Sequence, residues 1–240
     1  MLFIGDVHGE FKTYLYVLFR MQHKGGKRGV SCSFQLGDMG IGFQKGQDGF
    51  KKDGKTWSPE LGPEHKFIRG NHDSPALCRV HPNYAGDWRY FRKPDIFAVG
   101  GGYSVDYHWR TRNVSWWEDE QLNNRQMGQM FRFYKQYRPS IVVSHECPSV
   151  VKDAVLTNEE KRGKTSATEA KLQQMYEFHK PKLWIFGHHH KRYEVEVNGT
   201  MFVGLGELRY GKTSECVFEI PDLTWDGKGS EICLEPSSVM

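Results

Sequence analysis

The sequence predicts an α/β protein built as a four-layer αββα sandwich, with two mixed sheets packed together and flanked by helices. The first observation behind this prediction is a set of five short apolar runs, each followed directly by polar residues. The second is a later segment in which apolar and polar residues alternate around Asn198-Gly199, a typical hairpin turn. The early runs predict buried strands, and the alternating segment should complete a second sheet.

The five apolar runs have the length and composition of buried strands. They are Leu2–Ile4, Ser33–Leu36, Lys66–Ile68, Ile141–Val143 and Leu183–Phe186. In each case the polar cluster begins at or just beyond the carboxyl end of the run. Open α/β sheets bind their ligands at that edge, so five distant stretches of chain are expected to meet there.

Helices are predicted between these runs. A short helix is expected over Ser74–Arg79, and a Ser115–Glu118 capping box predicts a longer helix that ends near Tyr137. The apolar stripe of the longer helix is expected in the core rather than at a cofactor. It consists of Leu122, Met127, Met130, Phe131 and Tyr134.

The remaining segments are assigned from glycine content and alternation. Val105 and the aromatic residues near it are expected at strand positions close to the mouth of the site, where Asp106, His108 and Arg110 are candidates for substrate contact. In the C-terminal part, three further strands are predicted. They are Tyr193–Val197, Thr200–Val203 and Cys216–Ile220.

We expect residues 1–240 to form one domain, with 42–64 and 148–168 as loop or lid insertions. The basic run Lys161-Arg162-Gly163-Lys164 is either a solvated loop or a phosphate-steering one. There is no repeat and no apolar stretch long enough for a membrane span, so no membrane partner is expected. The first strand begins at Met1, which leaves no room for a signal peptide, and five cysteines without a CxxC pair fit the reducing cytoplasm. The net charge of +4 is modest, although seven tryptophans leave base stacking open.

The polar clusters contain carboxylates, imidazoles and one amide, a set that can hold two divalent cations side by side. No cysteine takes part, so the site offers oxygen and nitrogen ligands that suit Mn, Fe, Zn, Ni or Co. Asp6 and Asp38 bring two negative charges against the four positive charges of two such ions. The remaining positive charge suits a bridging hydroxide and an anionic phosphate.

In order, the clusters read GDVHG at 5–9, GD at 37–38, GNHD at 70–73, an isolated His145 and GHHH at 187–190. This series resembles the calcineurin-like metallophosphoesterase superfamily, whose pattern is GDxHG, GDxxD, GNHD/E, a lone His and GHxH. The resemblance implies that Asp6, His8 and His190 bind one metal. It implies that Asn71, His145 and His188 bind the other, with Asp38 bridging both. His189 is expected not to be a ligand.

The resemblance also implies a reaction. A hydroxide that bridges the two metals attacks the phosphate ester, and His72 protonates the leaving group as a general acid. Mn²⁺ is the activating ion we expect, with Fe, Zn, Ni or Co as the other possible ions. Arg69 matches an arginine that contacts phosphate in protein phosphatases, or else forms a structural ion pair. Asp73 either orients His72 or caps the following helix.

The sequence departs from the protein-phosphatase branch after Asp38. Where that branch continues as GDxxDRG, this chain reads Met39-Gly40-Ile41-Gly42, so the second aspartate and the arginine are missing. This leaves the partner of His72 unidentified and favours phosphodiesters, including nucleotides or nucleic acid, over phosphoproteins. The alternatives are a phosphomonoesterase acting on phosphoproteins and a non-catalytic metal-binding interaction module. The sequence does not indicate an oligomeric state.

Overall fold

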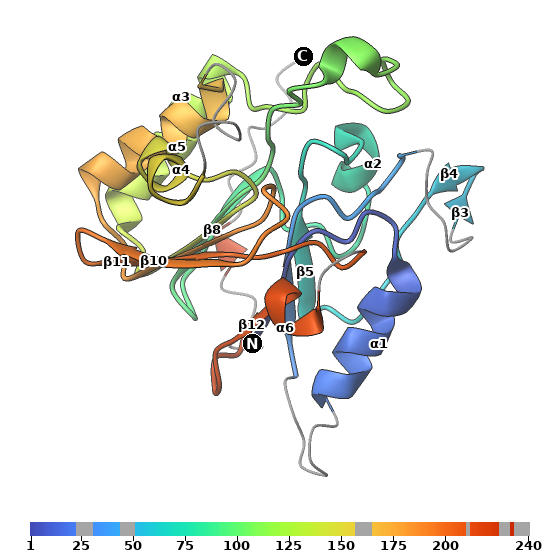
Figure 1. The fold of residues 1–240 in the computed structure, drawn as a ribbon, viewed down its shortest axis with the longest axis horizontal. Helices are drawn as coiled ribbons and strands as arrows, with labels where there is room; N and C mark the ends of the chain where they lie inside the picture. The colour runs from blue at the N-terminus through green and yellow to red at the C-terminus, as the bar shows by residue number, and fades with distance from the viewer. Residues whose placement is uncertain (23–30, 44–50, 157–164, 210–211, 226–230, 233–240) are drawn as a thin grey trace.

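Two mixed sheets pack face to face in the computed structural model, with helices on both outer sides (Figure 1). The residues that the structure describes are 1–22, 31–43, 51–156, 165–209, 212–225 and 231–232. The αββα sandwich predicted from the sequence is confirmed.

The smaller sheet has the strand order β12-β1-β2-β5. Its three inner members, β1 (Leu2–Ile4), β2 (Ser33–Leu36) and β5 (His65–Ile68), run parallel to one another. β12 (Val217–Glu219) pairs antiparallel with β1. The first and the last part of the described chain therefore share one sheet.

The larger sheet has seven strands in the order β10-β11-β9-β8-β7-β6-β13. Its four central strands, β11, β9, β8 and β7, are parallel, and antiparallel strands lie at both edges. The bounds are β6 (Trp88–Phe91), β7 (Ile96–Val99), β8 (Ile141–Ser144), β9 (Leu183–Phe186), β10 (Tyr193–Val197), β11 (Thr200–Gly204) and β13 (Glu231–Ile232).

Helices cover the outer face of each sheet (Figure 1). α1 (Phe11–Gln22) and α2 (Pro75–Arg79) lie on the side of the smaller sheet. On the side of the larger sheet lie α3 (Asn124–Tyr137), α4 (Ser149–Val155) and α5 (Ala167–Phe178). Two single turns, η2 (Tyr107–Trp109) and α6 (Thr213–Cys216), belong to the connections.

Apolar side chains fill all three spaces between these layers. In β1, Phe3 points into the space between the sheets, while Leu2 and Ile4 pack toward α1, because successive strand residues face opposite sides. In β9, Ile185 likewise faces the other sheet and Trp184 packs under the helices. Full burial of each large apolar side chain contributes roughly 1.5–3 kcal/mol, and this fixes the strand register that brings the polar clusters together.

The five predicted early strands and the three predicted late strands are all present in the described chain. The late strands divide between the sheets, however: β10 and β11 extend the larger sheet, whereas β12 joins the smaller one. The short helix after Asp73 is also confirmed as α2.

The predicted start of the long helix is wrong. α3 begins at Asn124, and its capping box is formed by Asn123 and Gln126. The side chain of Ser115 instead accepts a hydrogen bond from the backbone amide of Thr111, so this serine closes a turn. The predicted strand positions around Val105 are also wrong, since the segment forms a turn followed by η2.

The two insertions contain more regular structure than expected. Residues 51–56 form a small hairpin of β3 (Lys51–Lys52) and β4 (Lys55–Thr56) inside the predicted 42–64 loop. The 148–168 segment contains α4 and the start of α5. Residues 44–50 and the basic run 161–164 lie outside the described residues.

Among the described residues, no helix has the length and apolar character needed to cross a bilayer. Four of the five cysteines lie in the described part of the chain. Each is buried with a free thiol: Cys32, Cys78, Cys147 and Cys216.

Candidate metal centre

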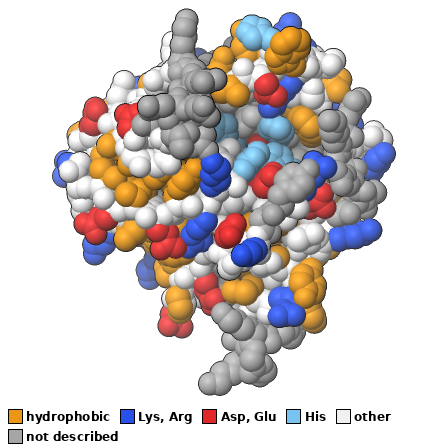
Figure 2. All heavy atoms as spheres, in the orientation of Figure 1, with side chains coloured by type: hydrophobic (Ala, Val, Ile, Leu, Met, Phe, Trp, Pro, Cys, Tyr) orange, Lys and Arg blue, Asp and Glu red, His pale blue; other side chains and the backbone are white. Residues whose placement is uncertain are grey.

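The seven predicted ligands meet at the carboxyl edge of the two sheets. They are Asp6 and His8 after β1, Asp38 after β2, Asn71 after β5, His145 after β8, and His188 and His190 after β9. Figure 2 shows histidine side chains gathered in a hollow of one face, with acidic and basic side chains around it. The convergence expected from the strand positions is therefore present.

The first group of ligand atoms comes from Asp6, His8, Asp38 and His190, and one atom of each lies within 4.8 Å of all the others. The Nε2 atoms of His8 and His190 are 3.1 Å apart. Oδ2 of Asp6 lies 3.1 Å from Nε2 of His190 and 3.8 Å from Nε2 of His8. Two carboxylates and two imidazoles thus surround one point.

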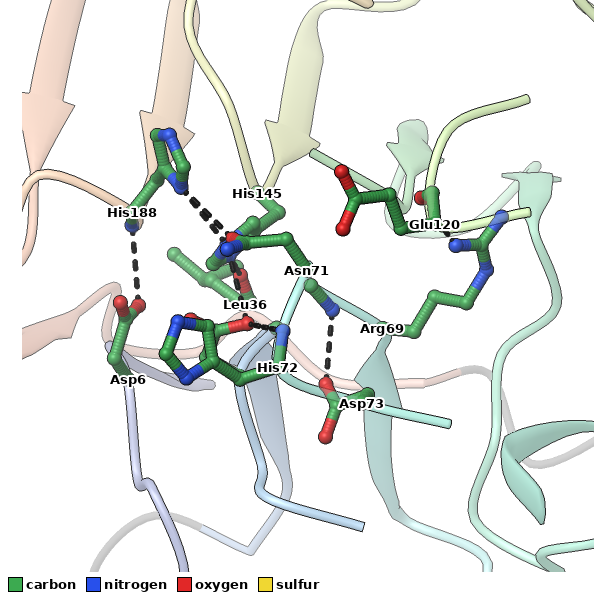
Figure 3. Close-up of polar contacts among 12 residues, drawn as sticks. Asp6, Leu36, Arg69, Asn71, His72, Asp73, Glu120, His145 and His188 are labelled. Atoms are coloured by element: carbon green, nitrogen blue, oxygen red, sulfur yellow. Dashed lines mark hydrogen bonds and ion pairs between the residues drawn. The ribbon is translucent and has the colours of Figure 1, made fainter. Parts of the chain in front are cut away.

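The second group comes from Asn71, His145, His188 and again Asp38. Oδ1 of Asn71 lies 3.1 Å from Nε2 of His145 and 3.1 Å from Nδ1 of His188. The two imidazole nitrogens are 3.3 Å apart, and His145 Nε2 is 3.4 Å from Oδ1 of Asp38. Figure 3 shows His188, His145 and Asn71 pointing toward one another from separate turns.

Asp38 belongs to both groups through different oxygens. Its Oδ2 lies 3.7 Å from His8 Nε2 in the first group, and its Oδ1 faces His145 in the second. Burial disfavours the charge of this carboxylate, but the imidazoles of His145, His72 and His8 outweigh burial and hold its pKa well below the usual range. Asp38 is therefore ionised and positioned between the groups.

The hydrogen bonds of the predicted ligand atoms show whether cations would fit between them. Nδ1 of His145 lies 2.9 Å from the backbone carbonyl of Leu36, so this nitrogen carries a proton, and in the neutral imidazole that a cation would bind, Nε2 is a bare acceptor. That acceptor faces the amide oxygen of Asn71, which is an acceptor as well. Oδ2 of Asp6 is buried with no hydrogen-bond partner. Acceptors that face each other in a buried site fit a cation between them, and the residues present therefore fit two divalent ions.

Four of the seven predicted ligands also occupy the left-handed backbone region, which non-glycine residues seldom adopt. Their φ values are 49° for His8, 54° for Asp38, 68° for His188 and 57° for His190. Each such residue costs of order 1–2 kcal/mol. The turns after the strands thus hold these side chains in place at a cost in stability, as functional sites commonly do.

Asn71 is oriented by residues that the sequence did not single out. Its Nδ2 donates to Oγ of Ser104 at 3.2 Å, which turns the amide oxygen toward the second group. Ser104 in turn donates through Oγ and its backbone amide to the two carboxylate oxygens of Glu120, at 2.6 and 2.8 Å. No local pattern marks Ser104 or Glu120, because their partners lie more than ten residues away.

A third carboxylate stands beside the first group. Oε2 of Glu207 lies 3.6 Å from His8 Nε2 and 3.6 Å from His190 Nδ1. Glu207 follows β11, at the same sheet edge, and the amide of Leu208 donates to the backbone oxygen of Asp6 at 2.8 Å. A carboxylate beside the second nitrogen of a ligand histidine fixes its orientation, and Glu207 has this position relative to Nδ1 of His190. The position of Glu207 after a parallel strand was the available signal for it.

His72 lies at the rim of the centre between a cation and an aromatic ring. The guanidinium of Arg110 donates to its Nε2 at 2.7 Å, and the ring of Phe43 stacks on it at 4.8 Å between centroids. The backbone amide of His72 donates to Oδ1 of Asp38 at 2.8 Å. Burial chiefly, with the charges of His8 and Arg110 adding to it, lowers the pKa of His72 to about 4. The unidentified partner of His72 is thus an arginine, and no acidic partner is found among the described residues.

For Arg69 the sequence left two roles open, phosphate contact and a structural ion pair, and the structure shows the ion pair. Its side chain is buried, points away from the ligand groups in Figure 3, and binds Oδ1 of Asp87 at 2.5 Å through Nε. Nη1 donates to the backbone oxygen of Glu120. Phosphate contact by Arg69 is not supported, because both ends of the guanidinium are engaged on the far side of the GNHD turn.

Asp73 has neither of the two predicted roles. Its carboxylate accepts hydrogen bonds from the backbone amides of Met39, Gly40 and Ile41 at 3.1, 2.7 and 2.9 Å, and from Gly70 at 2.9 Å. α2 begins after Ser74, and no side-chain cap bond is formed there. Asp73 therefore ties the turn that carries Asp38 to the turn that carries Asn71.

A pocket of about 460 Å³ opens beside the centre. Its lining includes Asp38, Asn71, His72, His188, Arg110 and Asp106. Other lining residues include Glu146, Lys152, Ser166 and Glu169. Burial raises the pKa of Glu146 to about 7. His189, predicted not to be a ligand, lies with its Nε2 3.3 Å from Sγ of Cys147.

The sequence profile described as calcineurin-like phosphoesterase matches residues 1–192. Among solved structures, TT1561 of Thermus thermophilus is similar with a TM-score of 0.50 and 12% identity, covering 88% of this chain and 90% of that one. A candidate 5′-nucleotidase of Staphylococcus aureus, in complex with α-ketoglutarate, has a TM-score of 0.48 and 15% identity over 86% of this chain and 48% of that one. GAP50, the anchor in the inner membrane complex of Plasmodium, has a TM-score of 0.48 and 11% identity, covering 91% of this chain and 77% of that one. Comparison with curated proteins gave no match.

Proposed function

The chain belongs to the calcineurin-like phosphoesterase family, hydrolases that act on phosphate esters, and from this premise we propose that it hydrolyses phosphodiesters at a centre of two divalent cations. The observation that carries the proposal is the position of Asp38, which presents one oxygen to each ligand group. A carboxylate shared in this way is expected where two cations act together on one phosphate.

Each cation would be held by an oxygen and nitrogen donor set. Asp6, His8 and His190 would hold the first ion, Asn71, His145 and His188 the second, and Asp38 both. When bound, such ions supply a water-derived nucleophile at neutral pH and polarise the phosphoryl oxygens. We propose Mn²⁺ as the activating ion, since imidazole and carboxylate together suit it.

His72 is proposed as the general acid for the leaving group. It lines the pocket next to Asp38 and is held by the stacked ring of Phe43. An alkoxide is a poor leaving group, so a proton delivered from this imidazole accelerates its departure. Because Nε2 accepts a hydrogen bond from Arg110 in the structure, it carries no proton there, so this role requires the contact to open and Nε2 to take up a proton before the leaving group departs.

The two other residues considered for catalysis act at a distance from the substrate in this proposal. Asp73 is a positioning residue that keeps the Asp38 and Asn71 turns in register. Arg69 stabilises the fold through Asp87. We place the protein in the cytoplasm, in keeping with the free thiols of the described cysteines.

Charge supports a phosphodiester as the substrate. Three carboxylates stand at the ligand groups, from Asp6, Asp38 and Glu207, against four positive charges of two divalent ions. The pocket adds no net charge through its two lining cations, since each pairs with an acid. These pairs are Arg110 with Asp106 and Lys152 with Glu169. With the hydroxide nucleophile counted, the ions and the groups around them carry no net charge, which suits a monoanionic diester better than a dianionic monoester.

The test compares hydrolysis of five substrates by protein stripped of metal and reloaded with Mn²⁺. The panel is a bis-aryl phosphate, a mono-aryl phosphate, a cyclic nucleotide, single-stranded nucleic acid and a phosphopeptide. We expect Mn²⁺-dependent turnover that is fastest with diesters. Faster turnover of the phosphopeptide would identify a phosphomonoesterase instead. Two bound ions with no turnover of any substrate would favour a non-catalytic metal-binding module.

A further inference from the structure

We propose that Arg110 binds a phosphoryl oxygen of the substrate, and that His72 and Asp106 occupy its Nη2 donors until the substrate arrives. This inference rests on the proposed phosphoesterase function and adds a substrate contact to it. Arg110 follows η2, in the connection between β7 and α3. Its side chain is about nine-tenths buried, yet it lines the pocket beside the metal centre.

The contacts of Arg110 direct it toward the reaction site. Nη2 donates to Nε2 of His72 at 2.7 Å and to Oδ1 of Asp106 at 2.6 Å. Nη1 reaches the backbone oxygen of Ser115 at 3.4 Å. Asp106 is half exposed, so it holds the guanidinium from the solvent side while His72 marks the side of the metal centre. The guanidinium thus contacts His72, and the backbone amide of His72 in turn donates to Asp38.

No other cation described in this chain is placed equally well. Lys152 also lines the pocket, but its ammonium binds Glu169 at 3.1 Å, beside Glu146 and Ser166. Arg69 is engaged with Asp87 outside the pocket. The turn after Asp38 contributes Met39 and Ile41, which are buried in the core and carry no charge. Among the described residues, Arg110 therefore supplies the positive charge of the pocket wall next to His72.

The contact with His72 is weaker than the contact a phosphate would make. A guanidinium gains one hydrogen bond from a neutral imidazole, whereas an anionic phosphoryl oxygen adds charge to the bond and accepts two parallel N–H donors. Arg110 has five N–H donors, and the contacts above engage Nη1 and Nη2. An entering phosphate is thus expected to draw Arg110 away from His72. The exchange frees Nε2 of His72 to face the leaving group.

The experiment measures binding of inorganic phosphate to Mn²⁺-loaded protein by calorimetry, together with kcat and KM for a bis-aryl phosphate. Arg110→Met should weaken phosphate binding by about 10- to 100-fold, because a hydrogen bond to a charged group is lost. The phosphate affinity of Arg110→Lys should lie between those of the wild type and Arg110→Met, since lysine keeps the charge but lacks the paired N–H donors of the guanidinium. Asp106→Asn releases Arg110 from a competing carboxylate and should tighten phosphate binding.

Arg112→Met is the matched control. Arg112 lies two residues further along the same loop, is largely exposed and pairs with Glu118, so this variant makes the same charge change outside the pocket. It should bind phosphate as the wild type does. Metal content and thermal unfolding of every variant show whether the fold and the two ions are kept. Phosphate binding is expected to weaken in Arg110→Met and to tighten in Asp106→Asn. If the Arg110–Asp106 pair served only the structure, both variants would weaken phosphate binding, so the two changes together distinguish a phosphate contact from a structural ion pair.

Phosphate affinity in Arg110→Met equal to that of Arg112→Met would overturn the inference, and so would weakened binding in Asp106→Asn. Its failure is distinguishable from failure of the proposed function. If the wild type hydrolyses diesters while Arg110→Met binds phosphate normally, the phosphoesterase stands and the Arg110 contact does not. If the wild type hydrolyses none of the esters, the calorimetric comparison still decides whether Arg110 binds phosphate.

Discussion

The backbone amide of His72 donates a hydrogen bond to Oδ1 of Asp38 at 2.8 Å. The same oxygen faces His145 in the second ligand group, while Oδ2 faces His8 in the first. One carboxylate is therefore fixed by the GNHD turn and shared by both ligand groups. Any change in its charge acts on the two cation sites together and on the turn that carries His72.

Asp38→Asn should reduce the affinity of both cation sites. The amide keeps the size of the side chain but removes a buried negative charge that lies between the two proposed cation sites. Elemental analysis after dialysis against limiting Mn²⁺ gives the bound metal per chain. Asp53→Asn, in the exposed turn between β3 and β4, is the control and should bind as the wild type does. Two tightly bound ions in Asp38→Asn would refute the bridging assignment.

His72→Ala should keep both metals and lose rate. The loss should reach roughly 10²-fold or more for alkyl esters, which need a proton on the leaving oxygen, and stay smaller for aryl esters. A plot of log kcat against the pKa of the leaving group should be steeper in the variant than in the wild type. An equal loss across the series would rule out the general-acid role while leaving the metal centre intact.

Glu207→Gln should weaken the binding of the first ion by about 10- to 100-fold, the effect typical of lost outer-shell carboxylates. The cause is the loss of the charge beside Nδ1 of His190 and Nε2 of His8. Calorimetric titration with Mn²⁺ should show one weakened and one unchanged step. Glu10→Gln provides the comparison, since Glu10 pairs with Arg209 instead. Two unchanged steps would show that Glu207 contributes nothing to the site.

Asp87→Asn should lower the free energy of unfolding by roughly 2 kcal/mol at neutral pH. Burial opposes the charge of Asp87, but the Arg69 guanidinium outweighs burial and lowers its pKa to about 2. A depressed pKa stabilises the fold above the unfolded value near 4, and that stability is lost as the pH falls through about 2. Urea unfolding of metal-free protein should therefore show the gap between wild type and variant closing from pH 4 downward. A gap that is constant with pH would contradict the ion pair.

The ligands could be predicted because each stands directly after a buried strand. Apolar runs such as Leu2–Ile4 and Leu183–Phe186 are readable locally, and parallel strands bring their carboxyl ends to one edge. Glu207 also follows such a strand, but the apolar and polar alternation before it predicts only the strand and does not mark Glu207 as part of the site. Ser104 and Glu120 act through Asn71, and nothing in their own neighbourhood marks that contact.

The sequence patterns that misled or left two roles open have one cause, which is competition among alternative partners for the same side chain. Ser115 and Glu118 have capping-box spacing, but Ser115 bonds to Thr111 and Glu118 pairs with Arg112, so the helix begins later. For Arg69 the motif left phosphate contact and a structural ion pair open, and Asp87, eighteen residues further along, forms the ion pair. A local motif names the possible partners of a side chain, and the tertiary fold selects among them.

The antiparallel pairing of β12 with β1 sets the shortest fragment that can work. A chain cut after His190 would retain the whole ligand signature, and by its motifs alone it would look intact. It would nevertheless lack Glu207 and the strand that covers the edge of β1, from whose end Asp6 and His8 emerge. Truncation studies should therefore keep the chain at least to Glu219, well past the last motif.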